Sequence, residues 1–245
     1  MDDFPFRMEG TKDTPLGMPD VGAIEKYTRM DYSIEDFYNY FPCFTGAKNL
    51  SRYLSLYECY RKTLGLAGHM AEVGVYRGGA SLFLAKLSLL HEPHAMTQVH
   101  GFDWFREPDA DDKPAHINQT YYEPYNRISE LIGVQGLQRY VLLHRLNVVT
   151  ELQGFFEEHS HLQFKLVFLD SGEYDIVARC IREFWPRMSN GAIMVFDQFN
   201  HEVAPGETKA LKELLPSDCI IRTFPQGWMP TAYVVKGERV VDLGR

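Results

Sequence analysis

The stretch from His69 to Ser81, HMAEVGVYRGGAS, constrains the fold of this chain more than any other. It predicts a buried strand that ends at an acid, Glu72, and passes through glycines into an apolar helix at about 80–90. Because glycine lacks a Cβ, a ligand can approach the backbone of such a turn closely. The start of the helix would offer N–H groups and a positive dipole end to a carboxylate or phosphate. The stretch therefore predicts a ligand-binding turn of an α/β fold, with an ordinary strand-to-helix turn as the alternative.

The charges around this turn narrow the class of ligand. Glu72 would face a cationic group, while the helix start would face an anionic one, and S-adenosylmethionine carries both. The loop lacks the second glycine of the dinucleotide motif, and Ala80 follows Gly79 where a phosphate-binding loop needs lysine. If Gly74 serves the approach of the ligand, Gly74→Val abolishes binding and leaves the fold intact. The candidate cofactor-binding residues in this loop are Glu72, Gly74, Tyr76, Gly78, Gly79 and Ser81.

Composition excludes several other classes of protein. Hydrophobic residues make up 45% of the 245 residues, enough for a sizeable core, and the net charge of −8 argues against binding nucleic acid through a broad basic face. No apolar run approaches the roughly 18 residues of a membrane helix, and no signal-peptide pattern is present. The four cysteines are scattered, so they indicate neither a zinc site nor a disulfide framework. We expect a cytoplasmic protein with a small-molecule partner.

The chain divides at about residue 64. Residues 1–64 are predicted to comprise an arm and an aromatic helical segment, Tyr32 to Leu64, in which Ser33 and Asp36 form a helix cap. The many aromatic residues favour a lid or a contact in a homo-oligomer, and plain packing on the domain is the alternative. Residues 65–245 are predicted to form the ligand-binding domain.

Strands and helices alternate after Gly68, which is typical of a mostly parallel sheet covered on both faces. Strands are predicted at 69–74, 97–102, 140–144, 165–170 and 191–196, followed by a hairpin at 219–224 and 231–236. Helices are predicted at about 80–90, 121–132, 148–158, 174–187 and 206–215. The fold class is thus α/β, doubly wound, with a seven-stranded sheet and an N-terminal helical extension. Ligands of such sheets bind beyond the carboxyl ends of the strands.

Asp103 ends the second predicted strand, about 30 residues after the glycine-rich loop. An acid at this position can accept hydrogen bonds from both hydroxyls of a ribose. Aspartates also cap loops at strand ends. We favour the ribose role because Glu72 and Gly74 already point to a nucleoside-containing ligand.

Two further acids, Asp170 and Asp197, each follow an apolar strand. Adjacent strands lie about 5 Å apart, so these carboxylates are expected side by side. With the amide oxygen of Gln198 they would suit Mg²⁺. Without a metal, the same closeness would raise the pKa of one acid and create a general base. His201, in the following loop, is a further candidate base or metal ligand.

Several motifs follow one another in order between about Tyr57 and Lys236, some three quarters of the chain. They are Glu72–Gly79, Gly101–Phe105, Leu169–Tyr174, the Trp185-Pro186-Arg187-Met188 turn with Asn190-Gly191, Asp197–Phe199 and Gly206–Ala210. This ordered set resembles the macrocin O-methyltransferase family of class I S-adenosylmethionine-dependent methyltransferases.

The resemblance implies a usually oligomeric enzyme that methylates a sugar hydroxyl with the help of Mg²⁺. It carries over Asp170 and Asp197 as metal ligands, with Asp170 or a neighbour near the hydroxyl proton. Gln198 and Gly172 stand where the family has acids, which weakens the expected metal site. The function expected is O-methyl transfer to a small polar acceptor, such as a sugar or glycosylated metabolite. The alternative is a binding or regulatory protein of the same fold with reduced catalysis.

Overall fold

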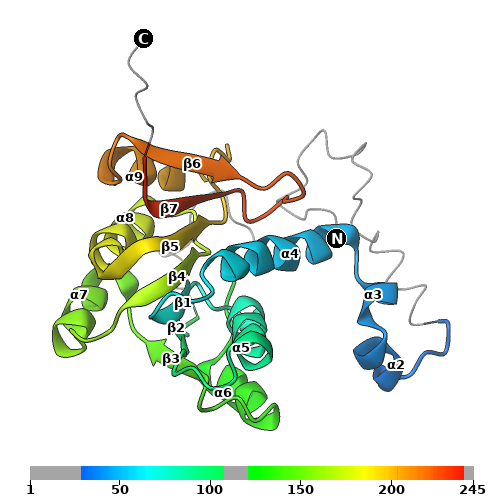
Figure 1. Ribbon diagram of the computed structural model, residues 1–245. Coiled ribbons are helices and arrows are strands. Elements are labelled where there is room, and N and C mark those ends of the chain that lie inside the picture. The colour runs from blue at the N-terminus through cyan, green and yellow to red at the C-terminus, as the bar shows by residue number, and fades with distance from the viewer. Residues whose placement is uncertain (1–28, 108–120, 203, 240–245) are drawn as a thin grey trace.

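One seven-stranded sheet organises the chain, in the order β3-β2-β1-β4-β5-β7-β6 (Figure 1). The structure is a computed structural model and describes residues 29–107, 121–202 and 204–239. Neighbouring strands from β3 to β5 are parallel, whereas β7 is antiparallel to both β5 and β6. The prediction of a mostly parallel sheet closed by a hairpin is confirmed.

The strands lie close to their predicted positions: β1 (His69–Val73), β2 (Val99–Asp103), β3 (Val141–Arg145), β4 (Phe164–Leu169), β5 (Met188–Phe196), β6 (Cys219–Thr223) and β7 (Ala232–Arg239). The helices between and after them are α5 (Gly79–His91), α6 (Tyr125–Val134), α7 (Val148–Glu158), α8 (Tyr174–Phe184) and α9 (Pro205–Leu214). Helix α6 starts four residues later than predicted, with Pro124 as its N-cap. Helix α8 ends at Phe184 and continues as a 3-10 turn containing Pro186, which has no N–H for an α-helical bond.

Helices cover both faces of the sheet and enclose two apolar cores. On one face α4 (Ala47–Lys62), α5 and α6 pack around Leu84 and Phe168. On the other, α7, α8 and α9 pack around Phe102 and Phe184. All six residues of β4 are buried, as expected for a central strand covered on both sides. The carboxyl ends of β1, β2, β4 and β5 therefore meet at one edge between two helical layers.

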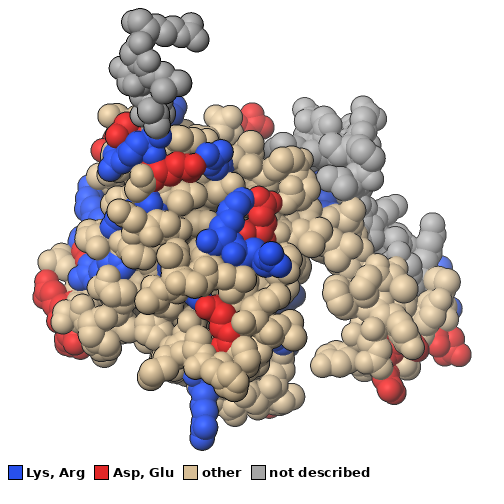
Figure 2. All heavy atoms as spheres, in the orientation of Figure 1, with Lys and Arg blue, Asp and Glu red and all other residues tan. Residues whose placement is uncertain are grey.

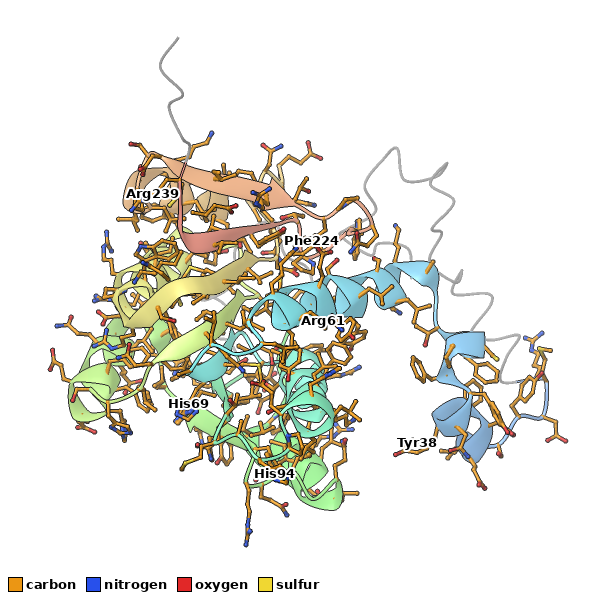
Figure 3. The ribbon with its side chains drawn as sticks, viewed as in Figure 1. Tyr38, Arg61, His69, His94, Phe224 and Arg239 are labelled. Carbon is orange, nitrogen blue, oxygen red and sulfur yellow. The ribbon has the colours of Figure 1, made fainter. Side chains whose placement is uncertain are left out.

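The aromatic segment before the sheet forms three helices, namely α2 (Ile34–Asn39), α3 (Phe41–Phe44) and α4. Ser33 and Asp36 cap α2 reciprocally, as predicted. Tyr32, Phe37 and Phe44 pack against one another, with ring centroids 4.3–6.3 Å apart. Figures 1 and 2 show α2 and α3 standing away from the sheet, and Tyr38, labelled in Figure 3, is 83% exposed. Their role in a lid or an oligomer contact stays a prediction, and residues 1–28 of the expected arm lie outside the described residues.

Helix α4, in contrast, is part of the domain. Leu56, Cys59 and Tyr60 are fully buried against the core. The loop between β6 and β7 packs on the same helix, where Nε2 of Gln226 donates to Glu58 and Lys48 lies over the Trp228 ring. These contacts fix the position of α4 relative to the sheet.

Charged side chains of both signs lie on the surface of the protein. In the face drawn in Figure 2, basic and acidic side chains are intermixed over a mostly uncharged surface. Among the described helices, none is both long and apolar enough to cross a membrane.

Candidate functional site

The loop between β1 and α5 is closed by the acid that ends β1. Glu72 Oε2 accepts hydrogen bonds from the backbone N–H of Ser81, at 2.8 Å, and from the Ser81 hydroxyl. Glu72 thereby satisfies an N–H group in the first turn of α5, where a helix has no internal acceptor to offer. The sequence prediction placed Glu72 and Ser81 in one site, and the structure brings them into direct contact.

Burial sets the protonation of Glu72. The residue is only 2% exposed, and burial raises the pKa of its carboxyl group to about 8, although the hydrogen bonds from Ser81 and the charge of Arg52 oppose this rise. A buried acid with such a pKa is largely neutral at pH 7. It becomes a carboxylate more readily when a cationic group lies beside it.

The structure gives Gly74 a role that differs from the predicted one. Its backbone has φ of +89°, and a Cβ there would lie 2.3 Å from the carbonyl oxygen of Asp170. Glycine is required at this position because the backbone after β1 approaches the backbone after β4 too closely for a Cβ. The expectation that Gly74→Val spares the fold is therefore wrong, because valine would collide with backbone rather than with a ligand.

The other loop residues also make structural contacts. Gly78 is the N-cap of α5 with φ of +77°, and Tyr76 has φ of +47° with its ring 5.6 Å from that of Tyr121. A Cβ on Gly79 would lie 3.0 Å from the hydroxyl of Tyr53, a residue of α4. The loop is thus packed between the sheet and α4, and contact of these residues with a cofactor stays a prediction.

Asp103 holds the glycine-rich loop to β2. Its Oδ2 accepts from the backbone N–H groups of Val75 and Tyr76, and its Oδ1 accepts from that of Phe105. This is the loop-capping arrangement that the sequence left as an alternative. Each carboxylate oxygen has two acceptor positions, so Oδ1 retains capacity for a hydroxyl donor. The predicted contact with a ribose is compatible with this geometry and stays untested.

Asp170 and Asp197 lie side by side, as the strand spacing predicted. Leu169 pairs with Phe196 in the parallel register of β4 and β5, so the acids follow at equivalent positions. Their exposure differs: the side chain of Asp170 is 26% exposed and that of Asp197 is 3% exposed. Asp170 is therefore the more accessible of the two carboxylates.

A cation that sequence reasoning missed joins these two acids. Arg52, on α4, donates from Nη1 to Asp197 Oδ1 at 2.7 Å and from Nη2 to Asp170 Oδ2. Burial alone would lower the pKa of the guanidinium, yet the adjacent carboxylates of Asp197 and Asp170 raise it above its usual range. Burial raises the pKa of Asp197 to about 8, against the opposing effect of Arg52. Arg52 is the permanent positive charge of this site.

Gln198 and Gly172, where the resembling family has acids, are packed against each other. A Cβ on Gly172 would lie 2.5 Å from the Cβ of Ala204 and 2.9 Å from Oε1 of Gln198. Nε2 of Gln198 donates to Asp197 Oδ2 at 3.2 Å, while Oε1 is buried without a hydrogen-bond partner among the described residues. A carboxylate at position 172 has no room in this arrangement.

A further buried acid lies behind Asp197. Glu207, at the start of α9, is fully buried and accepts from the backbone N–H of Gln198. Burial, together with the charge of Asp197, raises the pKa of Glu207 to about 9. His201 lies in the turn between Gln198 and α9 and lines a shallow surface groove with Lys209 and Lys212. Its candidate role as a base stays a prediction.

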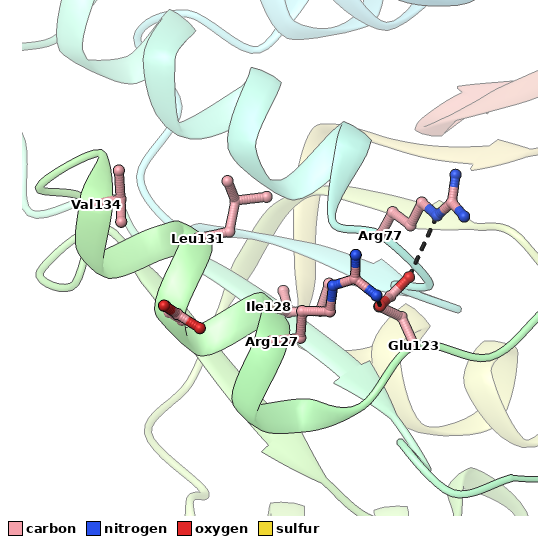
Figure 4. Close-up of a pocket in the computed structure, with 7 residues that line it drawn as sticks. Arg77, Glu123, Arg127, Ile128, Leu131 and Val134 are labelled. Carbon is pink, nitrogen blue, oxygen red and sulfur yellow. Dashed lines mark hydrogen bonds and ion pairs between the residues drawn. The ribbon is translucent and has the colours of Figure 1, made fainter.

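A second hollow lies beside the glycine-rich loop, against α6 (Figure 4). Glu123, which is 8% exposed, pairs there with Arg77 at 3.2 Å and with Arg127 at 3.0 Å. None of the strand-end acids lines this hollow. The side chain of Arg77 is thus engaged on the α6 side of the loop.

The comparisons with known proteins place this geometry in a family. A family model described as a methyltransferase domain matches residues 71–199, more than half of the chain. The chain belongs to this methyltransferase family. The match to this methyltransferase model covers the glycine-rich loop, Asp103, Asp170 and Asp197, whereas Arg52 lies outside it. The chain is accordingly an S-adenosylmethionine-dependent methyltransferase. Membership of the macrocin O-methyltransferase family in particular stays a prediction.

Solved structures of other methyltransferases share the fold. The calicheamicin methyltransferase CalS11 has 22% sequence identity and a TM-score of 0.76, over 89% of this chain and 94% of that chain. Its apo structure, described as a TDP-rhamnose 3'-O-methyltransferase, has 21% identity and a TM-score of 0.73, over 88% and 92%. The O-methyltransferase NovP has 17% identity and a TM-score of 0.59, over 76% and 79%. Among curated proteins, none matches the sequence significantly.

Proposed function

We propose that the cofactor binds at the carboxyl edge of the sheet, over the loop between β1 and α5. The observation that carries this proposal is the burial of Glu72, whose carboxyl group lies at the end of β1 with its pKa raised to about 8. An acid buried in this way is stabilised as a carboxylate by a cationic ligand group. S-adenosylmethionine carries an ammonium and a sulfonium, so the residues present fit it.

Each part of the loop then has a defined task. Glu72 faces the cationic end of the cofactor, and the start of α5 favours its carboxylate through the helix dipole. Asp103 holds the loop and offers Oδ1 to a ribose hydroxyl. When bound, S-adenosylmethionine supplies a methyl group on a positively charged sulfur, which is the electrophile of the reaction.

The reaction we propose is O-methylation of a small polar acceptor, and Asp170 is the proposed general base. Asp170 adjoins Gly74, beside the proposed cofactor site, and its side chain is the more exposed of the strand-end pair. Transfer of a methyl group requires alignment of the acceptor oxygen and removal of its proton, which Asp170 can take. His201 is the second candidate base.

A sugar or glycosylated metabolite is the proposed acceptor class. The similar fold of CalS11, which acts on TDP-rhamnose by its description, supports this choice. A catalytically reduced binding protein is the second candidate, and the packed Gly172 and Gln198 in place of acids favour it.

Calorimetry tests the first step of this proposal. We expect S-adenosylmethionine and its demethylated product, S-adenosylhomocysteine, to bind with micromolar dissociation constants. Absence of heat at high micromolar concentrations of folded protein contradicts the cofactor site. Turnover of the cofactor is then measured over a panel of nucleotide sugars and glycosides. Binding without turnover across the panel favours the binding-protein candidate.

A further inference from the structure

The position of Arg52 raises the question of what neutralises the two strand-end carboxylates. The resemblance implies that a divalent cation does so, held by Asp170, Asp197 and the residue after it. In this chain a guanidinium from α4 contacts both carboxylates directly. The Cζ atom of Arg52 also lies 5.2 Å from the ring centroid of Phe168, on β4 between the two helical layers. The guanidinium of Arg52 thus occupies the side of the two carboxylates at which a metal ion would bind.

The donor set does not fit a divalent cation in this arrangement. Gln198 directs its amide nitrogen toward Asp197, and its oxygen lies beside Gly172 instead. The opposite orientation of the amide would place two acceptor oxygens against each other. Within the described ranges, no group of three or more histidine, cysteine, aspartate or glutamate side chains is arranged to hold a metal. Oxygen ligands from two carboxylates that are already ion-paired leave a poor site for Mg²⁺.

Arg52 is held firmly enough to replace such an ion. The same helix carries the buried Leu56 and Tyr60, about one and two turns after Arg52. Lys62, at the end of the helix, donates to the hydroxyl of Tyr233 at 3.0 Å. The neighbouring residue, Tyr53, packs its hydroxyl against Gly79 of the glycine-rich loop. Because the guanidinium belongs to a residue of a fixed helix, it stays at the two carboxylates permanently, whereas a metal ion would bind and dissociate.

Arg52 also has donors left for a ligand. A guanidinium carries five N–H groups, and the hydrogen bonds recorded for the described residues use two of them. The side chain is 26% exposed, on the same edge as the 26% exposed side chain of Asp170. A hydroxyl bound at this edge can therefore meet a donor and a carboxylate together.

We propose that Arg52 is a catalytic residue that takes the place of the divalent cation: its guanidinium binds the acceptor oxygen, and no metal is needed. The inference rests on the methyl-transfer function proposed above. The acceptor hydroxyl gives its proton to the carboxylate of Asp170 while its oxygen forms a bond to the methyl carbon. The carbon–sulfur bond breaks, and its electron pair returns to sulfur, which becomes a neutral thioether. Arg52 stabilises the negative charge that develops on the oxygen.

Binding of Mn²⁺ tests the inference without any acceptor. Mn²⁺ prefers the same oxygen ligands as Mg²⁺ and is followed by electron paramagnetic resonance. We expect the wild-type protein to take up no stoichiometric Mn²⁺ at 100 μM, about the range in which a resident catalytic ion would bind. Uptake of one Mn²⁺ that is lost in Asp197→Asn overturns the inference.

Turnover with an acceptor found in the panel gives the second test. We expect full activity in excess chelator, a loss of about 100-fold in Arg52→Ala, and only partial recovery in Arg52→Lys, which lacks the planar fork. Arg61→Ala is the matched control, since Arg61 is an exposed arginine on the same helix without contact to the acids. Binding of S-adenosylhomocysteine by Arg52→Ala shows that the variant is folded.

The two tests separate the failure of this inference from failure of the proposed function. If chelation abolishes turnover and Mg²⁺ restores it, the protein is a methyltransferase and Arg52 is not its cation. If Arg52→Ala and Arg61→Ala retain equal turnover, the inference is equally refuted. If S-adenosylhomocysteine fails to bind to the wild-type protein, the proposed function itself has failed.

Discussion

The carbonyl oxygen of Asp170 occupies the space that a Cβ at Gly74 would need, at 2.3 Å. This contact joins the end of β1 to the end of β4, directly beside the proposed methyl-transfer site. The close approach that the glycine permits is therefore between two strands of the same sheet. It makes the geometry of the site depend on the packing of the backbone.

Replacement of Gly74 is expected to destabilise the fold. Gly74→Ala introduces a clash with backbone at φ of +89°, so we expect the free energy of unfolding to fall by about 2–4 kcal/mol. Gly154→Ala is the control, because Gly154 is exposed on α7 with no atom within 4 Å of the added carbon. It should gain about 0.5–1 kcal/mol. Urea unfolding measures both, and equal stability of the two variants would contradict the assigned role.

Binding of the cofactor is expected to release a proton from Glu72. At pH 7 the buried acid, with its pKa raised to about 8, is mostly protonated, and a cationic ligand group favours the carboxylate. Calorimetry in buffers of different ionisation enthalpy should show close to one proton released per ligand. Glu72→Gln, which retains an acceptor for Ser81, should remove this release, whereas Glu157→Gln on the exposed face of α7 should not. Identical release by all three proteins would show that another group titrates.

Two histidines on neighbouring strands of the sheet are expected to make the fold sensitive to acid. His100 on β2 and His144 on β3 stack at 5.1 Å, and burial with the neighbouring histidines lowers the pKa of His100 to about 3 and that of His144 to about 4. Both remain neutral in the folded state while the unfolded chain takes up protons below about pH 6.5. The stability that these two neutral histidines contribute is therefore fully present above about pH 6.5 and is lost as the pH falls toward 4.

The size of this effect follows from proton linkage. Each of these histidines should lower the free energy of unfolding by about 1.4 kcal/mol per pH unit between about pH 6 and the folded pKa. His100→Phe should reduce the slope by about one proton, and His94→Phe, at an exposed position labelled in Figure 3, should leave it unchanged. Unfolding in urea at several pH values measures the slopes. A slope that His100→Phe does not alter would contradict the assignment.

The elements that the sequence predicts best are those with a simple pattern. Apolar runs such as those of β4 and β5 locate strands, and the 5 Å spacing of strands correctly places Asp170 beside Asp197. The sequence predicted the turn at Gly74 but not the carbonyl of Asp170 beside it, because no local pattern reveals which carbonyl approaches a glycine.

Arg52 shows where the sequence stops being informative. It is separated from Asp170 by 118 residues and from Asp197 by 145, and it lies in an aromatic helix with no recognisable motif around it. The one available signal was electrostatic, since two acids at adjacent strand ends require a cation nearby. Sequence alone favoured a metal for that purpose, whereas the packing of α4 on the sheet supplies a guanidinium.

Hydrogen exchange with S-adenosylhomocysteine bound tests the central claim most directly. The account predicts slower exchange of backbone amides in residues 72–81 and around Asp103, with little change in α7 on the opposite helical layer. The measurement uses the full chain with saturating product, and mass spectrometry localises the protection. Binding of the product without protection of residues 72–81 would contradict a cofactor site at the loop between β1 and α5.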